Sequence, residues 1–324
     1  MTTPPATAPD PALATGPADA RPATLLSPHI LVPFIIVTLV WGSTWLVIRN
    51  QLGVVPPSWS VTYRFAVAAV AMFALALARR ERLWISARAQ GYALLLGLCQ
   101  FALNFNFVYR AEAFVTSGLV SVIFALLIIP NSLFSRVFLK TPVPRAFMAG
   151  AGIAAVGICL LLLHEVESVH GNMETVAFGA ILTFCGVLSA SASNVMQATT
   201  FGRAQSMFVI LAWAMLWGAS VDGLFALATV GPPVVDWRWG YMGGVLYLGL
   251  FGSVLSFPLY FGIIRAVGAG AAAWSSVLIP VIAMALSTLA EGYQWSGLSI
   301  AGAVLALAGL IVALRPSRPV APPA

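Results

Sequence analysis

The chain has 324 residues, of which 60% are hydrophobic and only 8% are charged, and its mean hydropathy is +0.95. A typical soluble domain is about 25% charged, so this composition excludes a soluble globular protein and indicates an integral membrane protein. The apolar segments lack the alternation of polar and apolar residues that a lipid-facing β-barrel needs, which leaves a helical bundle. In such a protein the net charge of +6 is expected in cytoplasmic loops, and no nucleic-acid partner is expected.

The N-terminal segment is rich in Pro, Ala and Thr and has no hydrophobic period, so it is predicted to be a disordered tail. It has neither the basic start nor the apolar core of a signal peptide, so the first apolar segment is predicted to be a retained span. At roughly 20 apolar residues per crossing, ten transmembrane helices follow. They are expected at residues 29–49, 58–79, 89–109, 112–135, 146–163, 175–199, 206–227, 239–264, 269–290 and 296–314.

The ten segments divide into two groups of five, whose orientations in the membrane would be opposite. The spacing from Pro130 to Gly152, 22 residues, recurs in the second group from Pro280 to Gly302. Inverted repeats are common in secondary transporters, which place the substrate site near the midplane between the halves. The predicted organisation is a tail, two five-helix repeats and a C-terminal tail, at residues 1–28, 29–164, 174–314 and 315–324.

The basic residues predict that both termini lie in the cytoplasm. With ten spans, twelve of the sixteen Lys and Arg fall on the side of the termini, and only Arg49, Arg64, Arg110 and Arg238 fall on the outer side. The turns expected near Arg110 and Arg265 are short. If either one were absent, the chain would have nine spans and its termini would lie on opposite sides.

The start of the first repeat resembles a known family. Trp41-Gly42-Ser43, Arg49, Pro56-Pro57 and Arg64-Phe65, with the Pro and Gly pattern of later spans, are similar to EamA-type members of the drug/metabolite transporter superfamily over roughly residues 30–314. Within it, the chain most resembles YddG-type amino-acid exporters of bacterial inner membranes. The resemblance implies ten spans, inverted repeats, a central cavity, alternating access and export of amino acids, aromatic ones included.

One turn departs from the family pattern. Family members often carry Leu-Gly-Glu after the fourth span, where this sequence has Lys140-Thr141, whereas the second repeat keeps Glu291-Gly292. We therefore expect Glu291 to act structurally at a helix end before it acts in transport. Asp222, in the outer part of the seventh span, is expected either to pair with a basic neighbour or to mark a helix end.

Polar side chains within a bilayer find no water, so they are expected to face the bundle interior or a wet cavity. Trp41 and Trp45 share a helix face at i, i+4 spacing, as do Gln100 and Asn104. The candidate residues for a substrate cavity are Trp41, Thr44, Trp45, Gln100, Asn104, Ser117, Ser121, Ser189, Ser193, Asn194, Tyr260, Trp274 and Ser275. Each has a structural alternative, because a membrane Ser commonly bonds its own i−4 carbonyl and a Trp can pack in the core.

Two other groups of residues suggest how the bundle packs and moves. Pro130 and Pro280 are predicted to kink their helices and to allow bending during alternating access, although kinks also occur without a moving role. The fifth and tenth spans are rich in Gly and Ala, including Gly150 and Gly309. Such helices approach each other closely, either between the two halves or between protomers, and a monomer is sufficient for transport.

Charged residues limit the mechanism. Arg49 and Arg64 are expected to reach the outer surface from the ends of their spans, which leaves no basic group near the midplane for a strongly anionic substrate. No carboxylate lies at the centre of the first span, where small multidrug-resistance relatives carry the glutamate that exchanges a proton for a cation. A neutral polar and aromatic cavity favours a zwitterionic metabolite moved by facilitated diffusion. The alternatives are a sugar, a nucleoside-type metabolite or a drug, a proton-coupled antiporter, and a channel.

The sequence predicts no enzyme, metal site or cofactor. The histidines lie at span ends or in loops, no paired carboxylates occur within a span, and the cysteines are isolated in apolar segments without metal spacing. These residues are His29, His164, His170, Cys99, Cys159 and Cys185. The expected partners are a small-molecule substrate and the lipid bilayer.

Overall fold

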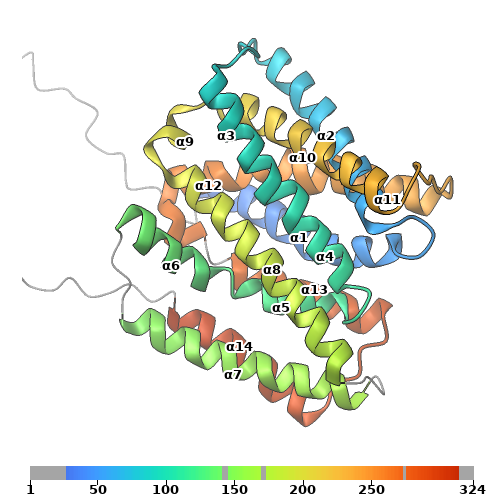
Figure 1. Ribbon diagram of the computed structural model, residues 1–324. Helices are drawn as coiled ribbons and strands as arrows, with labels where there is room; N and C mark the ends of the chain where they lie inside the picture. The colour runs from blue at the N-terminus through green and yellow to red at the C-terminus, as the bar shows by residue number, and fades with distance from the viewer. Residues whose placement is uncertain (1–26, 141–144, 169–172, 273–274, 314–324) are drawn as a thin grey trace, which may run out of the picture.

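The described part of the chain is a bundle of helices with no β-strand (Figure 1). The computed structural model describes residues 27–140, 145–168, 173–272 and 275–313. The two predicted tails therefore lie almost wholly outside the described residues. The all-helical fold with inverted repeats is confirmed.

In the first repeat, a π-helical segment at Leu98–Leu103 joins α3 to α4. The helices are α1 (Pro28–Gln51), α2 (Pro57–Ala78), α3 (Ala87–Gly97), α4 (Asn104–Ala111), α5 (Ser117–Ala125), α6 (Ile128–Leu139) and α7 (Arg145–Ser168). In the second repeat, a π-helical segment at Leu250–Leu255 joins α11 to α12. The helices are α8 (Met173–Ala198), α9 (Thr200–Ala204), α10 (Met207–Thr229), α11 (Trp239–Gly249), α12 (Ser256–Ala272), α13 (Ser275–Ala290) and α14 (Gly297–Ala313).

Ten crossings result when α3 is joined to α4, α5 to α6 and α11 to α12. Within the described residues, eight helical segments are long and apolar enough to cross a bilayer, and α13 and α14 are apolar helices of 16 and 17 residues. A helix rises about 1.5 Å per residue, so these two cover most of a hydrocarbon core about 30 Å thick. The predicted number of spans agrees with the structure.

The fourth span differs from the prediction in two ways. The fourth span begins at Ser117 instead of residue 112, because residues 112–116 form the turn after α4. Its helix breaks at Leu126 and Leu127, where the chain makes only short-range turns before α6. Pro130 explains the break, because its ring cannot donate to the carbonyl of Leu126 and collides with it.

The turn predicted near Arg265 is wrong. The helix α12 continues past that residue to Ala272, and the next helix begins at Ser275. The other predicted kink, at Pro280, lies inside α13 without ending it.

The third and eighth spans show the internal repeat most clearly. The helices α3 and α11 each have 11 residues, end at a glycine, and continue into a six-residue π-helical segment. A Cβ atom added at Gly97 would lie 2.3 Å from the Ala214 carbonyl oxygen of α10, and one added at Gly249 would lie 3.1 Å from the Arg64 carbonyl oxygen of α2. Arg64 and Ala214 are both the eighth residue of their helices. The two repeats therefore pack in the same way around α2 and α10.

The helices α7 and α14 lie side by side along the lower edge of Figure 1 and join the two repeats. A Cβ atom added at Gly150 would lie 2.3 Å from the backbone nitrogen of Ala313, and one added at Gly309 would lie 2.3 Å from that of Ala154. Backbones this close leave room only for glycine. Of the two alternatives left open by the sequence, close packing between the halves is the one observed.

We predict that Gly150→Ala destabilises the protein and that Gly152→Ala, on the same helix, does not. The added methyl group at position 150 meets α14 backbone, and overpacking of this kind costs about 1–3 kcal/mol. A Cβ atom at Gly152 meets no atom within 4 Å. The measurement is the apparent melting temperature of each purified variant in detergent. Equal melting temperatures for the two variants would contradict this account of the interface.

Candidate functional site

A central cavity of about 130 Å³ lies between the two repeats. Its walls come from α1, α2, α4 and α5 of the first repeat, from α8, α12 and α13 of the second, and from the π-helical segment of the third span. Nine of the thirteen residues predicted for a substrate cavity line it. They are Trp41, Thr44, Trp45, Gln100, Asn104, Ser121, Asn194, Tyr260 and Ser275.

Four predicted site residues are placed differently. The Ser117 hydroxyl donates to Glu291 at 2.6 Å, at one end of the bundle. The Ser193 hydroxyl bonds Gln100 from behind the cavity wall, and Ser189 is also absent from the lining. Trp274 lies outside the described residues. Ser117 and Ser193 therefore bond other groups of the protein.

The π-helical segments bring polar side chains to the cavity for a backbone reason. A π-helical turn shifts the hydrogen-bond register and leaves carbonyl groups without helical partners, and in lipid each must find one. The Ser253 hydroxyl bonds the Leu248 carbonyl at 2.9 Å, and the Asn104 amide bonds the Gln100 carbonyl at 3.3 Å. Trp41 Nε1 reaches across from α1 to the Gly252 carbonyl at 3.1 Å.

Aromatic rings form much of the cavity wall. The Trp41 ring lies 5.0 Å from that of Tyr260 and 5.6 Å from that of Phe257, and the Trp45 ring lies 5.3 Å from that of Phe124. These centroid distances are those of favourable edge-to-face and tilted pairs. The cavity therefore offers flat apolar surfaces beside its polar groups.

Arg64 is the main correction to the sequence analysis. Arg64 is only 2% exposed and lines the cavity, so its side chain does not reach the outer surface. Its guanidinium carbon lies 4.1 Å from the centre of the Phe105 ring, and its Nε and Nη2 atoms each lie 3.4 Å from the Ser253 hydroxyl. A basic group is therefore present in the cavity where none was expected.

Four buried polar atoms on cavity-lining residues have no hydrogen-bond partner within the described structure: Arg64 Nη1, Trp45 Nε1, Asn104 Oδ1 and Ser121 Oγ. Buried polar groups are almost always bonded. Two of these atoms are donors, one is an acceptor and the hydroxyl can be either. A small molecule with both an acceptor and a donor group would satisfy them.

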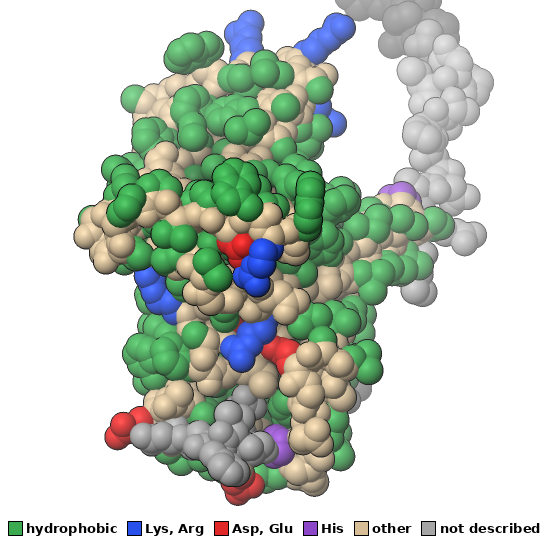
Figure 2. All heavy atoms as spheres, turned by 90° about the vertical axis from the view of Figure 1, so that its right-hand side faces the viewer, with side chains coloured by type: hydrophobic (Ala, Val, Ile, Leu, Met, Phe, Trp, Pro, Cys, Tyr) green, Lys and Arg blue, Asp and Glu red, His purple; other side chains and the backbone are tan. Residues whose placement is uncertain are grey.

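A second group of polar residues lies where α4 and α13 end and α5 begins, and it consists of Arg49, Glu112, Ser117 and Glu291. We call this part of the bundle the Glu112 end. Glu291 accepts from the Ser117 hydroxyl and lies 3.6 Å from Arg49 Nε. Arg49 was expected to reach lipid headgroups, and instead it is 38% exposed at the side chain and pairs with this carboxylate. The group ties α1, α5 and α13 together. In Figure 2, which faces this end, the few charged side chains lie among hydrophobic ones.

Glu112 itself is fully buried, and neither carboxyl oxygen has a hydrogen-bond partner in the described residues. Burial raises the pKa of this carboxyl well above its usual range, and the negative charge of Glu291 raises it further. The positive charges of Arg49 and Arg64 act in the opposite direction and are smaller influences. The neutral acid is therefore favoured at this position.

Asp222 belongs to a third polar group, and this one is structural. It accepts from the Asn106 amide, and Arg110 donates to the Asn106 oxygen at 3.1 Å and to the Ser58 hydroxyl at 3.0 Å. These bonds join α2, α4 and α10. None of the ion pairs found among the described residues includes Asp222, so its link to the basic Arg110 runs only through Asn106.

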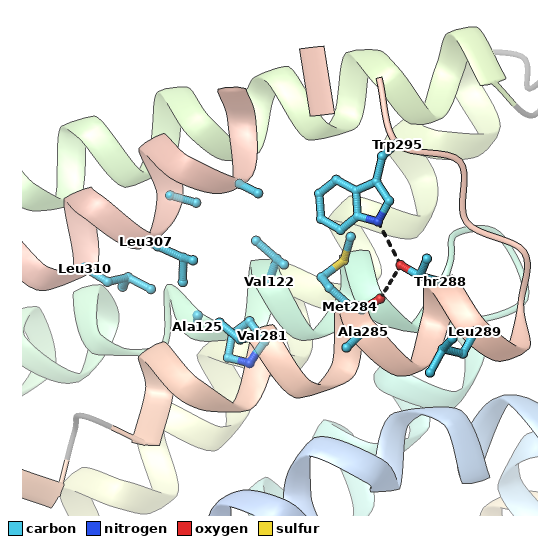
Figure 3. Close-up of a pocket in the computed structure, with 13 residues that line it drawn as sticks. Val122, Ala125, Val281, Met284, Ala285, Thr288, Leu289, Trp295, Leu307 and Leu310 are labelled. Carbon is cyan, nitrogen blue, oxygen red and sulfur yellow. Dashed lines mark hydrogen bonds between the residues drawn. The ribbon is translucent and has the colours of Figure 1, made fainter. Parts of the chain in front are cut away.

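A larger cavity of about 490 Å³ lies between α5, α13 and α14, but it is almost wholly apolar (Figure 3). Its few polar groups bond one another: Trp295 Nε1 donates to the Thr288 hydroxyl at 2.9 Å, which donates to the Met284 carbonyl at 2.8 Å. Among the described residues that line this cavity, no buried side-chain polar atom lacks a hydrogen-bond partner. The smaller central cavity is therefore the candidate transport site.

The model of the EamA-like transporter family matches residues 29–163 and, a second time, residues 177–315. The chain belongs to this family. Each match covers one of the two groups of five crossings, so each repeat is one copy of the family's unit. The resemblance drawn from the first repeat is confirmed at the family level.

Three similar proteins are known by name. The chain is 26% identical to "Protein PagO" of Salmonella typhimurium, over 82% of this chain and 86% of that protein. It is 28% identical to "Uncharacterized inner membrane transporter YedA" of Escherichia coli K12, over 88% and 92%. It is 23% identical to "Probable amino-acid metabolite efflux pump" of Salmonella typhimurium, over 86% and 92%. A solved crystal structure matches with a TM-score of 0.65 at 20% identity, over 87% of this chain and 95% of that one, and shows the shared fold.

The buried Glu112 carboxyl predicts a pH dependence of stability. Between the ordinary carboxyl pKa and the raised one, the folded state holds a proton that the unfolded state has released, so stability falls as pH rises through that range. We expect the apparent melting temperature of the wild type to drop as the pH rises above the ordinary carboxyl pKa, and Glu112→Gln to reduce this drop.

The matched control is Glu81→Gln, which removes a carboxylate at the opposite end of the bundle, paired with Arg79. It should leave the drop in place. A Glu112→Gln variant whose melting temperature falls as steeply as that of the wild type would contradict the neutral state of Glu112.

Proposed function

We propose that this chain is a secondary transporter that exports small zwitterionic metabolites, amino acids including aromatic ones among them, across the bacterial inner membrane. The observation that carries the proposal is the central cavity, which lies between two inverted repeats and combines aromatic walls with unpartnered polar atoms. Such a cavity suits a molecule with a charged pair and an apolar side chain. Two relatives support it by name, as an inner membrane transporter and as an amino-acid metabolite efflux pump.

The proposed orientation places both termini in the cytoplasm. It rests on the distribution of Lys and Arg, twelve of which fall on the side of the termini. The Glu112 end then faces outward. The contact of Arg49 with Glu291 and of Ser117 with Glu291 closes that side across α1, α5 and α13.

The proposed cycle is alternating access by one chain. Outward opening would require the contacts of Glu291 to separate. The helix break at Leu126 and Pro280 within α13 lie at the level of the cavity, where bending would change access. Facilitated diffusion requires no proton-carrying group in addition to this cavity. A proton-coupled antiporter is the second candidate, and the buried carboxyl of Glu112 is the observation that favours it.

We predict that purified protein in liposomes takes up labelled amino acids, and that Trp41→Ala and Asn104→Ala each weaken apparent affinity about 10-fold, as expected for loss of one buried polar or aromatic contact. Trp84→Ala and Asn50→Ala are matched controls, because both residues are exposed at the surface. A screen in which sugars or nucleosides move and amino acids do not would refute the substrate class. Conductance without saturable exchange would show a channel.

We also predict that exchange proceeds without any ion gradient, because the proposed mode is facilitated diffusion. The measurement compares uptake at equal pH on both sides with uptake under an imposed pH gradient. Counterflow of labelled against unlabelled substrate at equal pH is the expected result. Strict dependence on the gradient would replace facilitated diffusion with proton coupling.

A further inference from the structure

Arg64 occupies a position that the fold does not require to be an arginine. Its counterpart in the second repeat is Ala214, since both are the eighth residue of their helix and both present a carbonyl to the last glycine of the neighbouring helix. Ala214 is fully buried in that role. The same backbone packing is therefore achieved with a methyl group, and the long charged side chain of Arg64 is an addition by one repeat only.

The guanidinium of Arg64 enters the cavity without a full set of partners. Its Nε and Nη2 atoms share the Ser253 hydroxyl at the long distance of 3.4 Å, and the Tyr109 hydroxyl also contacts the guanidinium. The Nη1 atom has no hydrogen-bond partner in the described structure. None of the ion pairs found among the described residues includes Arg64. The Phe105 ring below it offers a weaker electrostatic contact. A buried cation in this state calls for an anion.

The carboxyl group that acts on Arg64 from within the protein is a poor counter-ion. Glu112 is the acid whose charge is coupled to Arg64, and burial favours its neutral form. The other acid of that group, Glu291, already bonds Ser117 and pairs with Arg49. The positive charge of Arg64 thus remains available to the cavity.

We propose that Arg64 binds the carboxylate of the transported molecule. The proposal rests on the central cavity being the transport site and defines its substrate class as molecules with one carboxylate. A guanidinium donates parallel hydrogen bonds to the two oxygens of a carboxylate, and the unpartnered Trp45 Nε1 is a second donor in the lining of the same cavity. One cation matches one carboxylate, whereas a doubly charged phosphate ester would keep an uncompensated charge.

The remaining unpartnered atoms fit the rest of a zwitterion. Asn104 Oδ1 and Ser121 Oγ are the acceptors available to an ammonium group. Because Arg64 has no equivalent in the second repeat, the two halves of the cavity differ in charge. The substrate then binds in one orientation, with its carboxylate toward the π-helical segment that carries Ser253.

The test compares amino acids with their own amides, which keep the side chain and ammonium group and lack the carboxylate. Phenylalanine, leucine and threonine, each beside its amide, compete for uptake of labelled amino acid by the full chain in liposomes, and thermal stabilisation by each compound reports binding directly. We expect the wild type to prefer each acid to its amide by about 10-fold or more, the usual effect of a charge-assisted hydrogen bond. Arg64→Gln should weaken the binding of each acid by that factor and leave the binding of each amide within about twofold of the wild-type value.

Arg64→Lys keeps the charge and should retain part of the preference, which a purely structural role would not predict. The control is Arg79→Gln, because Arg79 is half exposed and lies outside the cavity. Equal binding of acids and amides by the wild type overturns the proposal even if no Arg64 variant folds. An Arg64→Gln variant that weakens the binding of an acid and of its amide equally also overturns the proposal.

Failure of the proposed function gives a different result. If no amino acid binds but phenylpropionate or another simple carboxylate stabilises the wild type in an Arg64-dependent way, the carboxylate site stands and the amino-acid assignment falls. If amino acids are exchanged and Arg64→Gln does not discriminate acid from amide, the function stands and the carboxylate site falls.

Discussion

The structure depends on helices that approach so closely that only a glycine fits between them. In lipid, helix association draws no strength from the hydrophobic effect, so it relies on close packing and on interhelical hydrogen bonds. Gly97 against Ala214 and Gly249 against Arg64 fix α3 to α10 and α11 to α2 at equivalent positions. Immediately after each glycine the helix becomes π-helical. The polar side chains that satisfy these altered turns are therefore held where the two repeats meet.

The cavity combines a symmetric backbone with asymmetric side chains. The repeats share helix lengths, the glycine contacts and the π-helical segments, yet Asn104 and Gln100 line one wall while Ser253 supports the other. Arg64 and Ala214 share a backbone role and differ by a full charge. Symmetry of the backbone allows two equivalent states of access, whereas asymmetry of the side chains gives the bound molecule a single orientation. The first property comes from the packing of the backbone and the second from the side chains.

The sequence predicted the fold well because hydropathy and charge act at the level of whole helices. The number of spans, the repeat and the close approach expected of the Gly-rich spans follow from composition and spacing. Whether these spans pack between the two halves or between protomers was left open by the sequence, and the structure shows Gly150 and Gly309 between the halves. Most proposed cavity residues were found in the same way, since i, i+4 polar pairs on a span must face inward. Ser117 and Ser193 share this inward direction but bond Glu291 and Gln100, and no periodicity separates a partnered hydroxyl from a free one.

Arg64 could not be placed correctly by depth alone. A residue about 9 Å into a span, at 1.5 Å per residue, can snorkel only if its helix face is open to the surface, and α2 packs against α10 and α11 there. A usable signal was present, because Val61 and Ala68 share the face of Arg64 at i−3 and i+4, and both are fully buried. Small and β-branched neighbours at those spacings indicate a helix–helix interface. An arginine on such a face has its polar partners within the protein, and in this protein that direction leads into the cavity.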